Sequence, residues 1–201
     1  MSSARRRLVL VALTGLAALG VLAVGLLAPP APRPPGPVDL DAVLVVDDLP
    51  TTHVRGPIEY PQSPPLGGRH NPVWLDCGVY DTPVQAENLV HDLEHGTVFI
   101  AYREDLSDDD VAALSEQLPS NGIMSPWADL AAPVVVTVWG HQLALDGAHD
   151  PRLPLFLRTY GGGETAPEPM ASCAGGLHDA DGTADTRRGG AAQTGDDVTA
   201  V

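Results

Sequence analysis

Apolar and polar residues follow one another in blocks along this chain, and the first long block is apolar throughout. Residues 8–27 carry no charge, and a helix of that length spans roughly 30 Å, about the thickness of the hydrocarbon core of a bilayer. Arginines at 5–7 precede the block, which favours a cytoplasmic segment 1–7 and an external remainder. We therefore predict a transmembrane anchor over residues 8–28, in a single-pass protein of the cell membrane with its N-terminus inside. A cleaved signal peptide is the alternative, although Pro29 and Pro30 make a poor cleavage context.

Beyond residue 50 the pattern predicts helices interleaved with strands. Pro83 is tolerated in a first helical turn and Gly96 favours an end, so a helix is expected over 83–95, with Asp81 or Thr82 as its cap. Further helices are expected over 107–118, capped by Ser107, and over 150–160, and strands over 73–75, 97–102, 123–125, 133–139 and 141–145. The acidic run 108–110 suits the first turn of its helix and does not indicate a calcium site.

Composition sets the limits of the folded part. Residues 29–39 are rich in proline and predict an extended spacer, whereas residues 179–201 are poor in large apolar groups and predict a disordered acidic tail. The extracytoplasmic domain is therefore expected between residues 40 and 178. Its helices and strands predict an α+β fold: one compact domain, with a mixed sheet and two to three packed helices.

The charge of the external part excludes one class of partner. All eleven basic residues are arginine, three of them lie at 5–7, and none of the 26 acidic residues precedes the apolar block. A surface so acidic repels phosphate backbones, so we expect no nucleic-acid binding and no adhesion to anionic lipid. Contact with the membrane is then expected only through the anchor, and no motif indicates a particular protein partner.

The only two cysteines, Cys77 and Cys173, both lie in the external part. In an oxidising compartment a lone pair most simply forms one disulfide. A metal-binding thiolate or a redox-active pair is the alternative, although the spacing is not Cys-x-x-Cys.

Histidines carry the main chemical signal. His91 and His95 are four residues apart, so on a helix they share a face, and His53 and His70 lie in Pro-Gly loops that can fold over that face. Copper and zinc both take imidazole ligands, so these four residues predict a metal site, with Glu94 orienting one of the histidines without binding the metal itself. Histidines that only hydrogen-bond or pack are the alternative, and the protein is then a non-catalytic envelope interaction module. His141 is a candidate extra ligand, and His149 and His178 are expected on the surface.

The same segment, His91-Asp92-Leu93-Glu94-His95, also matches the inverted zincin pattern, in which both histidines bind zinc and the glutamate activates water. Glu164 or Glu168 then supplies a third ligand. Against a peptidase, Gly96 ends the helix at once, so whether the protein is an enzyme stays open, with the non-catalytic interpretation favoured. No nucleophile elbow, phosphate loop or dinucleotide fingerprint occurs.

Several segments together resemble the family of domains of unknown function numbered 3105. They are Gly67-Gly68-Arg69-His70-Asn71-Pro72, Cys77-Gly78-Val79-Tyr80, Val90 to Gly96, Val138-Trp139-Gly140 and Ala166-Pro167-Glu168-Pro169. The resemblance covers about residues 50 to 177, and its most specific element is Leu-Glu-His-Gly at 93–96. It implies a bacterial, single-anchor, extracytoplasmic protein and brings no established activity with it.

Overall fold

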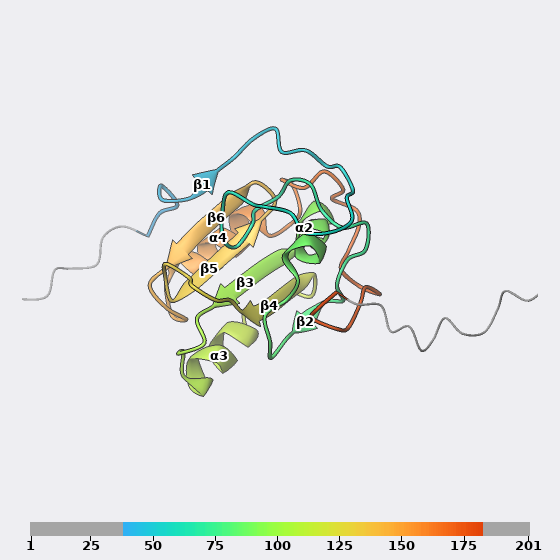
Figure 1. Cartoon of the computed structure of the whole chain (residues 1–201). Helices are drawn as coiled ribbons and strands as arrows, with labels where there is room; N and C mark the ends of the chain where they lie inside the picture. The colour runs from blue at the N-terminus through green and yellow to red at the C-terminus, as the bar shows by residue number, and fades with distance from the viewer. Residues whose placement is uncertain (1–37, 183–201) are drawn as a thin grey trace, which may run out of the picture. The chain divides into compact units, whose positions relative to one another are not determined.

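The computed structural model describes residues 38–182 of the 201-residue chain (Figure 1). The predicted cytoplasmic segment 1–7, the anchor 8–28, most of the spacer and the tail from residue 183 lie outside the described residues. Within the described part, none of the helices has both the length and the apolar character needed to cross a membrane.

Six strands form one mixed sheet in the order β1-β6-β5-β3-β4-β2. β4 runs parallel to both of its neighbours, β3 and β2, and the other neighbouring strands are antiparallel. The strands are β1 (Leu44–Val45), β2 (Gly78–Val79), β3 (Val98–Tyr102), β4 (Gly122–Pro126), β5 (Val134–Val138) and β6 (His141–Leu145), and the helices are α2 (Ala86–Glu94), α3 (Asp108–Ser115) and α4 (Arg152–Tyr160). A mixed sheet with three helices in one compact domain confirms the α+β prediction.

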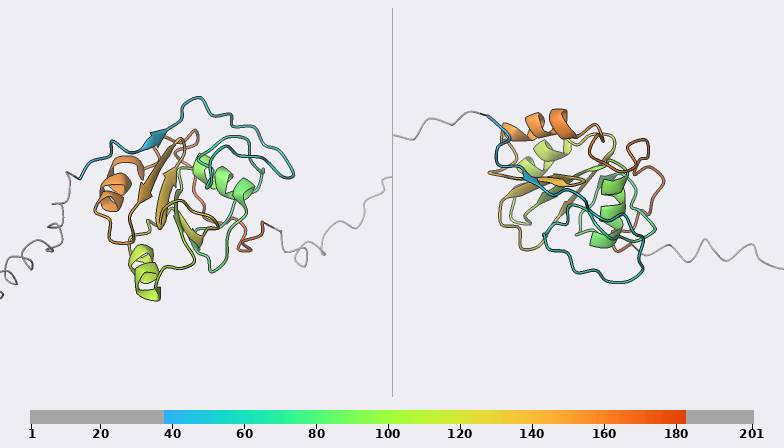
Figure 2. Two further views of the ribbon diagram at one scale, coloured as in Figure 1. Left: turned by 60° about the vertical axis from the view of Figure 1, so that its left-hand side comes forward. Right: turned by 90° about the horizontal axis from the view of Figure 1, so that it is seen from above.

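The sheet is covered on both faces, with α3 and α4 on one face and α2 on the other (Figure 2). Val98 and Ile100 of β3 point toward α3 and α4, while Phe99 points toward α2, because successive side chains of a strand alternate between the two faces. β5 is buried on both faces in the same way. This explains why both strands read as continuous apolar runs in the sequence.

The first predicted helix begins later than expected. Neither Asp81 nor Thr82 is its cap; α2 starts at Ala86, after Gln85, whose side chain makes no capping hydrogen bond. The backbone N–H of Gln85 instead donates to the carbonyl of Ala180 at 2.7 Å. Gln85 is therefore held by a contact from Ala180, far along the chain.

The other elements agree closely with the sequence pattern, with exceptions at the sheet edges. Ser107 caps α3 by accepting the N–H of Asp110, and the strands β3, β4, β5 and β6 lie where strands were predicted. The predicted strand 73–75 is absent apart from an isolated bridge between Leu75 and Leu177. The two-residue strands β1 and β2 were not predicted, because two residues are too few to show a period of two.

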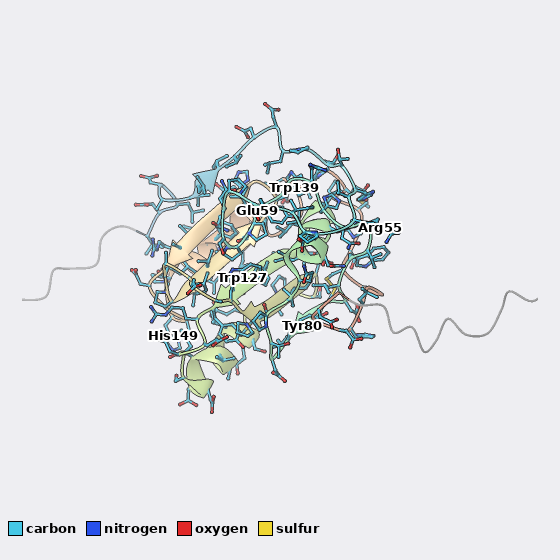
Figure 3. The ribbon with its side chains drawn as sticks, in the orientation of Figure 1. Arg55, Glu59, Tyr80, Trp127, Trp139 and His149 are labelled. Atoms are coloured by element: carbon cyan, nitrogen blue, oxygen red, sulfur yellow. A yellow bond between two sulfur atoms is a disulfide. The ribbon has the colours of Figure 1, made fainter. Side chains whose placement is uncertain are left out.

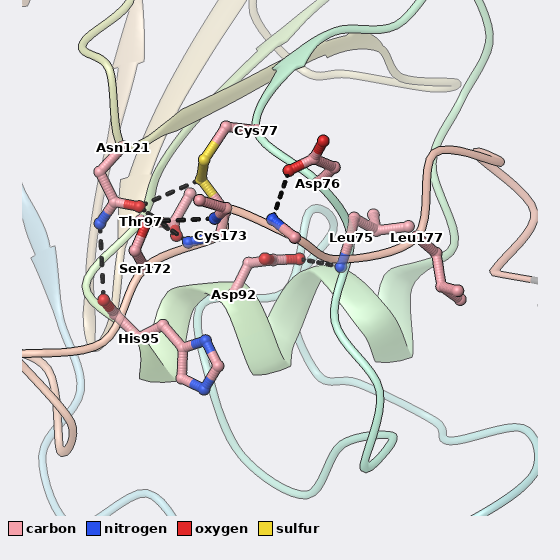
Figure 4. The surroundings of a disulfide bond; sticks show 12 residues. Leu75, Asp76, Cys77, Asp92, His95, Thr97, Asn121, Ser172, Cys173 and Leu177 are labelled. Atoms are coloured by element: carbon pink, nitrogen blue, oxygen red, sulfur yellow. Dashed lines mark hydrogen bonds between the residues drawn. A yellow bond between two sulfur atoms is a disulfide. The ribbon is translucent and has the colours of Figure 1, made fainter.

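The predicted disulfide joins Cys77 to Cys173, which are 96 positions apart in the chain (Figure 4). It fastens the C-terminal segment beside residues 74–77, where Leu177 donates to the carbonyl of Trp74 at 2.9 Å. Because both sulfurs are bonded to each other, neither is available as a thiolate ligand. Closing so long a loop stabilises the fold by roughly 4 to 5 kcal/mol in the chain-entropy picture.

Candidate metal centre

Two loop segments place His53 and His70 beside each other. The two residues form a parallel bridge, in which the N–H of Val54 donates to the carbonyl of His70 at 2.7 Å and the N–H of His70 donates to the carbonyl of Thr52 at 3.2 Å. Two pairing hydrogen bonds fix the loops relative to each other without any extended strand.

Polar side chains of α2 hold these loops against the helix. The Glu87 carboxylate accepts the N–H of Ile58 at 2.9 Å, and the Asn88 amide donates to the carbonyl of Val73 at 2.7 Å. The backbone carbonyl of Glu87 accepts the N–H of Asn71 at 3.0 Å. The loops that carry His53 and His70 are thereby docked onto the same helix that carries His91.

Four side chains then meet: His53, His70, His91 and Glu94 each offer one ligand atom, and these atoms all lie within 4.8 Å of one another. His91 and Glu94 are three residues apart on α2, so they share a face of the helix. His70, His91 and Glu94 are buried, whereas the side chain of His53 is 49% exposed. Three of the four ligand residues are therefore buried, and His53 is the member of the group with substantial exposure.

Backbone carbonyls fix which nitrogen of two imidazoles carries hydrogen. His70 Nδ1 lies 2.8 Å from the carbonyl oxygen of Gly68, and His91 Nδ1 lies 2.7 Å from that of Asn71. Because a carbonyl only accepts, each Nδ1 must donate its hydrogen. In the neutral rings the lone pair is then on Nε2, as in metal-binding histidines, which usually donate their other N–H to a carbonyl or carboxylate.

The lone pair of His70 faces a carboxylate. His70 Nε2 lies 3.0 Å from Glu94 Oε2, and it has no hydrogen-bond partner with proper geometry although it is fully buried. His53 Nε2 lies 3.7 Å from the same oxygen. At this distance the lone pair of His70 Nε2 and the Glu94 oxygen repel each other unless a proton or a metal ion lies between them. The contact is therefore favourable only when a positive charge is present there.

Burial keeps His91 neutral. Desolvation, opposed by the hydrogen bond to Asn71 and reinforced by the neighbouring His95, His70 and His53, lowers the pKa of His91 to about 4. At neutral pH its Nε2 is therefore unprotonated, which is the form that binds metal.

His95 lies next to this group. Its Nε2 is 3.1 Å from His91 Nε2 and 3.6 Å from Glu168 Oε2, and the ring of Trp74 packs on both His91 and His95, with centroids 5.5 and 5.2 Å apart. α2 ends immediately before His95, and Gly96 follows with a φ of +78° that favours glycine. A Cβ at Gly96 would lie 3.0 Å from the Cα of Gly163, so this glycine allows the segment that carries Glu168 to approach the end of α2.

Three of the four predicted ligands lie together, and Glu94 takes the place of the fourth, His95. His53, His70 and His91 belong to the group of four, whereas His95 contacts His91 and lies outside that group. Glu94, expected in a supporting role, has its carboxylate among the candidate ligand atoms themselves. The sequence contained a signal for this, because Glu94 follows His91 by three positions and so lies on the same helical face.

The remaining histidines lie elsewhere. His141 Nδ1 lies 3.2 Å from the carbonyl oxygen of Trp139, and its ring packs on Tyr160 of α4, so it does not join the group as an extra ligand. His149 and His178 are on the surface as predicted, with side chains 79% and 85% exposed. Figure 3 places His149 beside α3, whereas Trp139, whose ring contacts His70, lies beside α2.

The donor atoms limit which metal fits. The group offers imidazole nitrogens and carboxylate oxygen but no sulfur: the cysteines form a disulfide, and Met124 is buried in the core on the α3 and α4 face. Copper(II) and zinc(II) suit such donors, whereas copper(I) prefers thiolates and thioethers.

The inverted zincin arrangement finds partial geometric support. His91 and His95 are adjacent and Glu168 approaches His95, as that pattern requires of a third ligand. The Glu94 side chain, however, is only 5% exposed and faces His53 and His70. A buried carboxylate in contact with two imidazoles is poorly placed to activate a water molecule against a substrate.

The comparisons with known proteins give a family and no activity. A family model described as "Protein of unknown function (DUF3105)" matches residues 53–175, a range that contains all of the residues of the candidate centre. No curated protein and no solved structure matches the chain.

Proposed function

Because the chain belongs to the DUF3105 family, whose description assigns no activity, we propose from the site itself that this domain binds one divalent transition metal ion. The ion is copper(II) or zinc(II), and the ligands are His53, His70, His91 and Glu94. The role is binding or storage of the ion and not catalysis.

The observation that carries the proposal is the orientation of two buried imidazoles. His70 and His91 each donate their Nδ1 hydrogen to a backbone carbonyl, so Nε2 is the atom of each ring that can bind a cation. His70 Nε2 faces a carboxylate oxygen at 3.0 Å, and His91 Nε2 lies 3.1 Å from His95 Nε2. Among the described residues His70 Nε2 has no hydrogen-bond partner, and burying such an atom without a partner costs stability.

The proposed location is the outer side of a cell membrane, with residues 8–28 as the anchor. The disulfide supports an oxidising compartment, and the uncharged block after the arginines at 5–7 supports the orientation. The acidic composition supports metal capture there, because a negative surface raises the local concentration of cations.

Metal loading tests the proposal directly. The full chain is purified in detergent, and any nickel that remains from purification is removed. It is then incubated with copper or zinc and desalted, and the bound metal is measured by elemental analysis. We expect close to one equivalent of one of the two metals, and a trace of both would contradict the proposal.

Substitutions then assign the ligands. His70→Ala and His91→Ala should each lower the affinity by more than about 100-fold. Each removes a side chain that binds the ion directly, and residues that only orient such ligands already contribute about 10- to 100-fold. His141→Ala is the matched control, because that ring packs on Tyr160 outside the centre, and it should bind as the unaltered chain does. Circular dichroism of each variant separates loss of a ligand from loss of the fold.

A further inference from the structure

His95 has contacts that the group of four does not explain. Its ring is almost completely buried, its Nδ1 has no hydrogen-bond partner among the described residues, and its Nε2 lies between His91 Nε2 at 3.1 Å and Glu168 Oε2 at 3.6 Å. These three side chains form a row that runs outward from the candidate centre.

We propose that His91, His95 and Glu168 form a second, outer metal subsite, through which the ion enters and leaves the inner site of His53, His70, His91 and Glu94. This inference rests on the proposed function, because it assigns a route to the same ion.

The spacing of the two imidazoles in the row suits a metal ion. His91 Nδ1 donates to Asn71, so the two facing Nε2 atoms of His91 and His95 compete for a single proton, and a cation between them takes the place of that proton. Two nitrogens bound tetrahedrally at 2.0 to 2.1 Å from zinc lie roughly 3.3 Å apart. The observed 3.1 Å between the Nε2 atoms is close to this separation.

Exposure increases along the row from His91 to Glu168. His91 is buried, the side chain of His95 is 8% exposed, and that of Glu168 is 57% exposed. The backbone N–H of Glu168 donates to the carbonyl of Glu94 at 3.0 Å, which anchors this carboxylate at the end of α2. Glu168 is therefore a fixed negative charge at the outer end, where a hydrated cation first meets the row.

His91 belongs to both subsites, and this determines how they are filled. Its Nε2 has one lone pair, because its Nδ1 hydrogen is committed to Asn71. One ion at a time can use that lone pair, so the subsites are occupied in turn. The ion then moves inward as His91 keeps its bond while His95 and Glu168 are exchanged for His70 and Glu94.

Trp74 provides the signal for a test, since its ring packs on both His91 and His95 and copper(II) quenches nearby indole fluorescence. Stopped-flow mixing of the full chain in detergent with copper(II) measures the rate of binding, and Trp74→Phe shows which part of the signal comes from this ring. Elemental analysis of the same samples gives the number of bound ions.

Glu168→Gln should slow the binding of copper(II) about tenfold, the lower end of what a local field contributes to association rates. His95→Gln should slow it as well, because the outer subsite loses a ligand, and each variant should still bind one ion. Glu164→Gln removes the same charge from the same segment. Glu164 makes no ion pair with a histidine within residues 38–182, so this variant should bind at the unaltered rate.

Three results would each contradict a different part of these proposals. Unchanged rates in both Glu168→Gln and His95→Gln, with one ion still bound, would overturn the outer subsite and leave the inner site intact. Two ions in the unaltered chain, with one lost in His95→Gln, would overturn alternate occupancy. Absence of any bound copper or zinc in the unaltered chain would overturn the proposed function itself.

Discussion

The two faces of the sheet are built from different kinds of side chain. On the face covered by α3 and α4, the buried cluster is apolar, and the buried Asp150 at the start of α4 accepts hydrogen bonds from Arg152 and from the N–H of Asp146. The α2 side also has an apolar cluster, but it buries several polar side chains beside it: His70, Glu87, Asn88, His91, Asp92, Glu94 and His95.

The faces also differ in how completely buried polar atoms are satisfied. Within residues 38–182, the buried side-chain atoms without a hydrogen-bond partner are His70 Nε2, Trp74 Nε1, Asp92 Oδ1, His95 Nδ1 and Thr165 Oγ1. None of them belongs to α3, α4 or their core. Folded proteins leave few such groups, so their concentration around α2 sets this side apart. The apolar face contributes stability alone, whereas the α2 side leaves buried polar atoms unsatisfied, which is what the proposed metal site predicts.

The largest expected effect comes from the apolar face. Phe156 of α4 is fully buried, so Phe156→Ala should lower the free energy of unfolding by about 3 to 5 kcal/mol, measured by urea denaturation. Metal affinity should stay unchanged while the variant is folded, because α4 and α2 lie on opposite faces of the sheet. A folded Phe156→Ala variant that binds metal poorly would break the distinction between the faces.

A smaller change in the free energy of unfolding is expected at Asp150, the buried polar residue on the α3 and α4 face, whose carboxylate has hydrogen-bond partners. Burial opposes ionisation of Asp150, but hydrogen bonds from the Arg152 guanidinium and from the N–H groups of Asp146 and Arg152 outweigh it and lower its pKa to about 2. The folded state thus holds this proton less tightly than the unfolded state, so the stabilisation is complete above about pH 4 and is lost as the pH falls toward 2.

Asp150→Asn should therefore cost about 1 kcal/mol at pH 7, less than the pKa difference alone implies because solvent screens the pair. The unfolding curves of the variant and the unaltered chain should converge as the pH falls toward about 2. A cost that is the same at both pH values would show that the charge of Asp150 is not what stabilises the start of α4.

The sequence predicts one face better than the other for a physical reason. Residues 98–102 and 134–138 are apolar and mostly β-branched or aromatic, and Ser107 is followed by an acidic first turn, so local chemistry is enough to place β3, β5 and α3. The start of α2 was misplaced, and the residue before it, Gln85, is bound by Ala180, which is distant in the sequence.

The candidate site depends still more on distant contacts. The spacing of His91 and Glu94 follows from the helical repeat, and the proximity of His53 to His70 was expected only in general terms. Which loop residues reach α2 is decided by Glu87 and Asn88, whose side chains bind backbone groups of the loop. No periodic pattern encodes such bonds, so residue types alone could not show which loop residues lie against α2.

Glu94→Gln tests the difference between the two faces most sharply, because the stability of the chain and its metal affinity should change in opposite directions. In Glu94→Gln, the amide can donate a hydrogen bond to His70 Nε2, which in the unaltered chain faces a carboxylate oxygen at 3.0 Å. Satisfying that buried acceptor should raise the free energy of unfolding of the metal-free chain by about 1 kcal/mol. The same change removes an anionic ligand, so the affinity for copper(II) or zinc(II) should fall by at least about 10-fold.

Urea denaturation of the metal-free protein and titration with metal measure the two quantities on one sample. Glu116→Gln, directly after α3 and exposed, is the matched control and should change neither. If Glu94→Gln destabilised the metal-free chain and left the affinity unaltered, Glu94 would be a structural partner of His70. The polar groups around α2 would then serve to stabilise the fold and would not form a metal site.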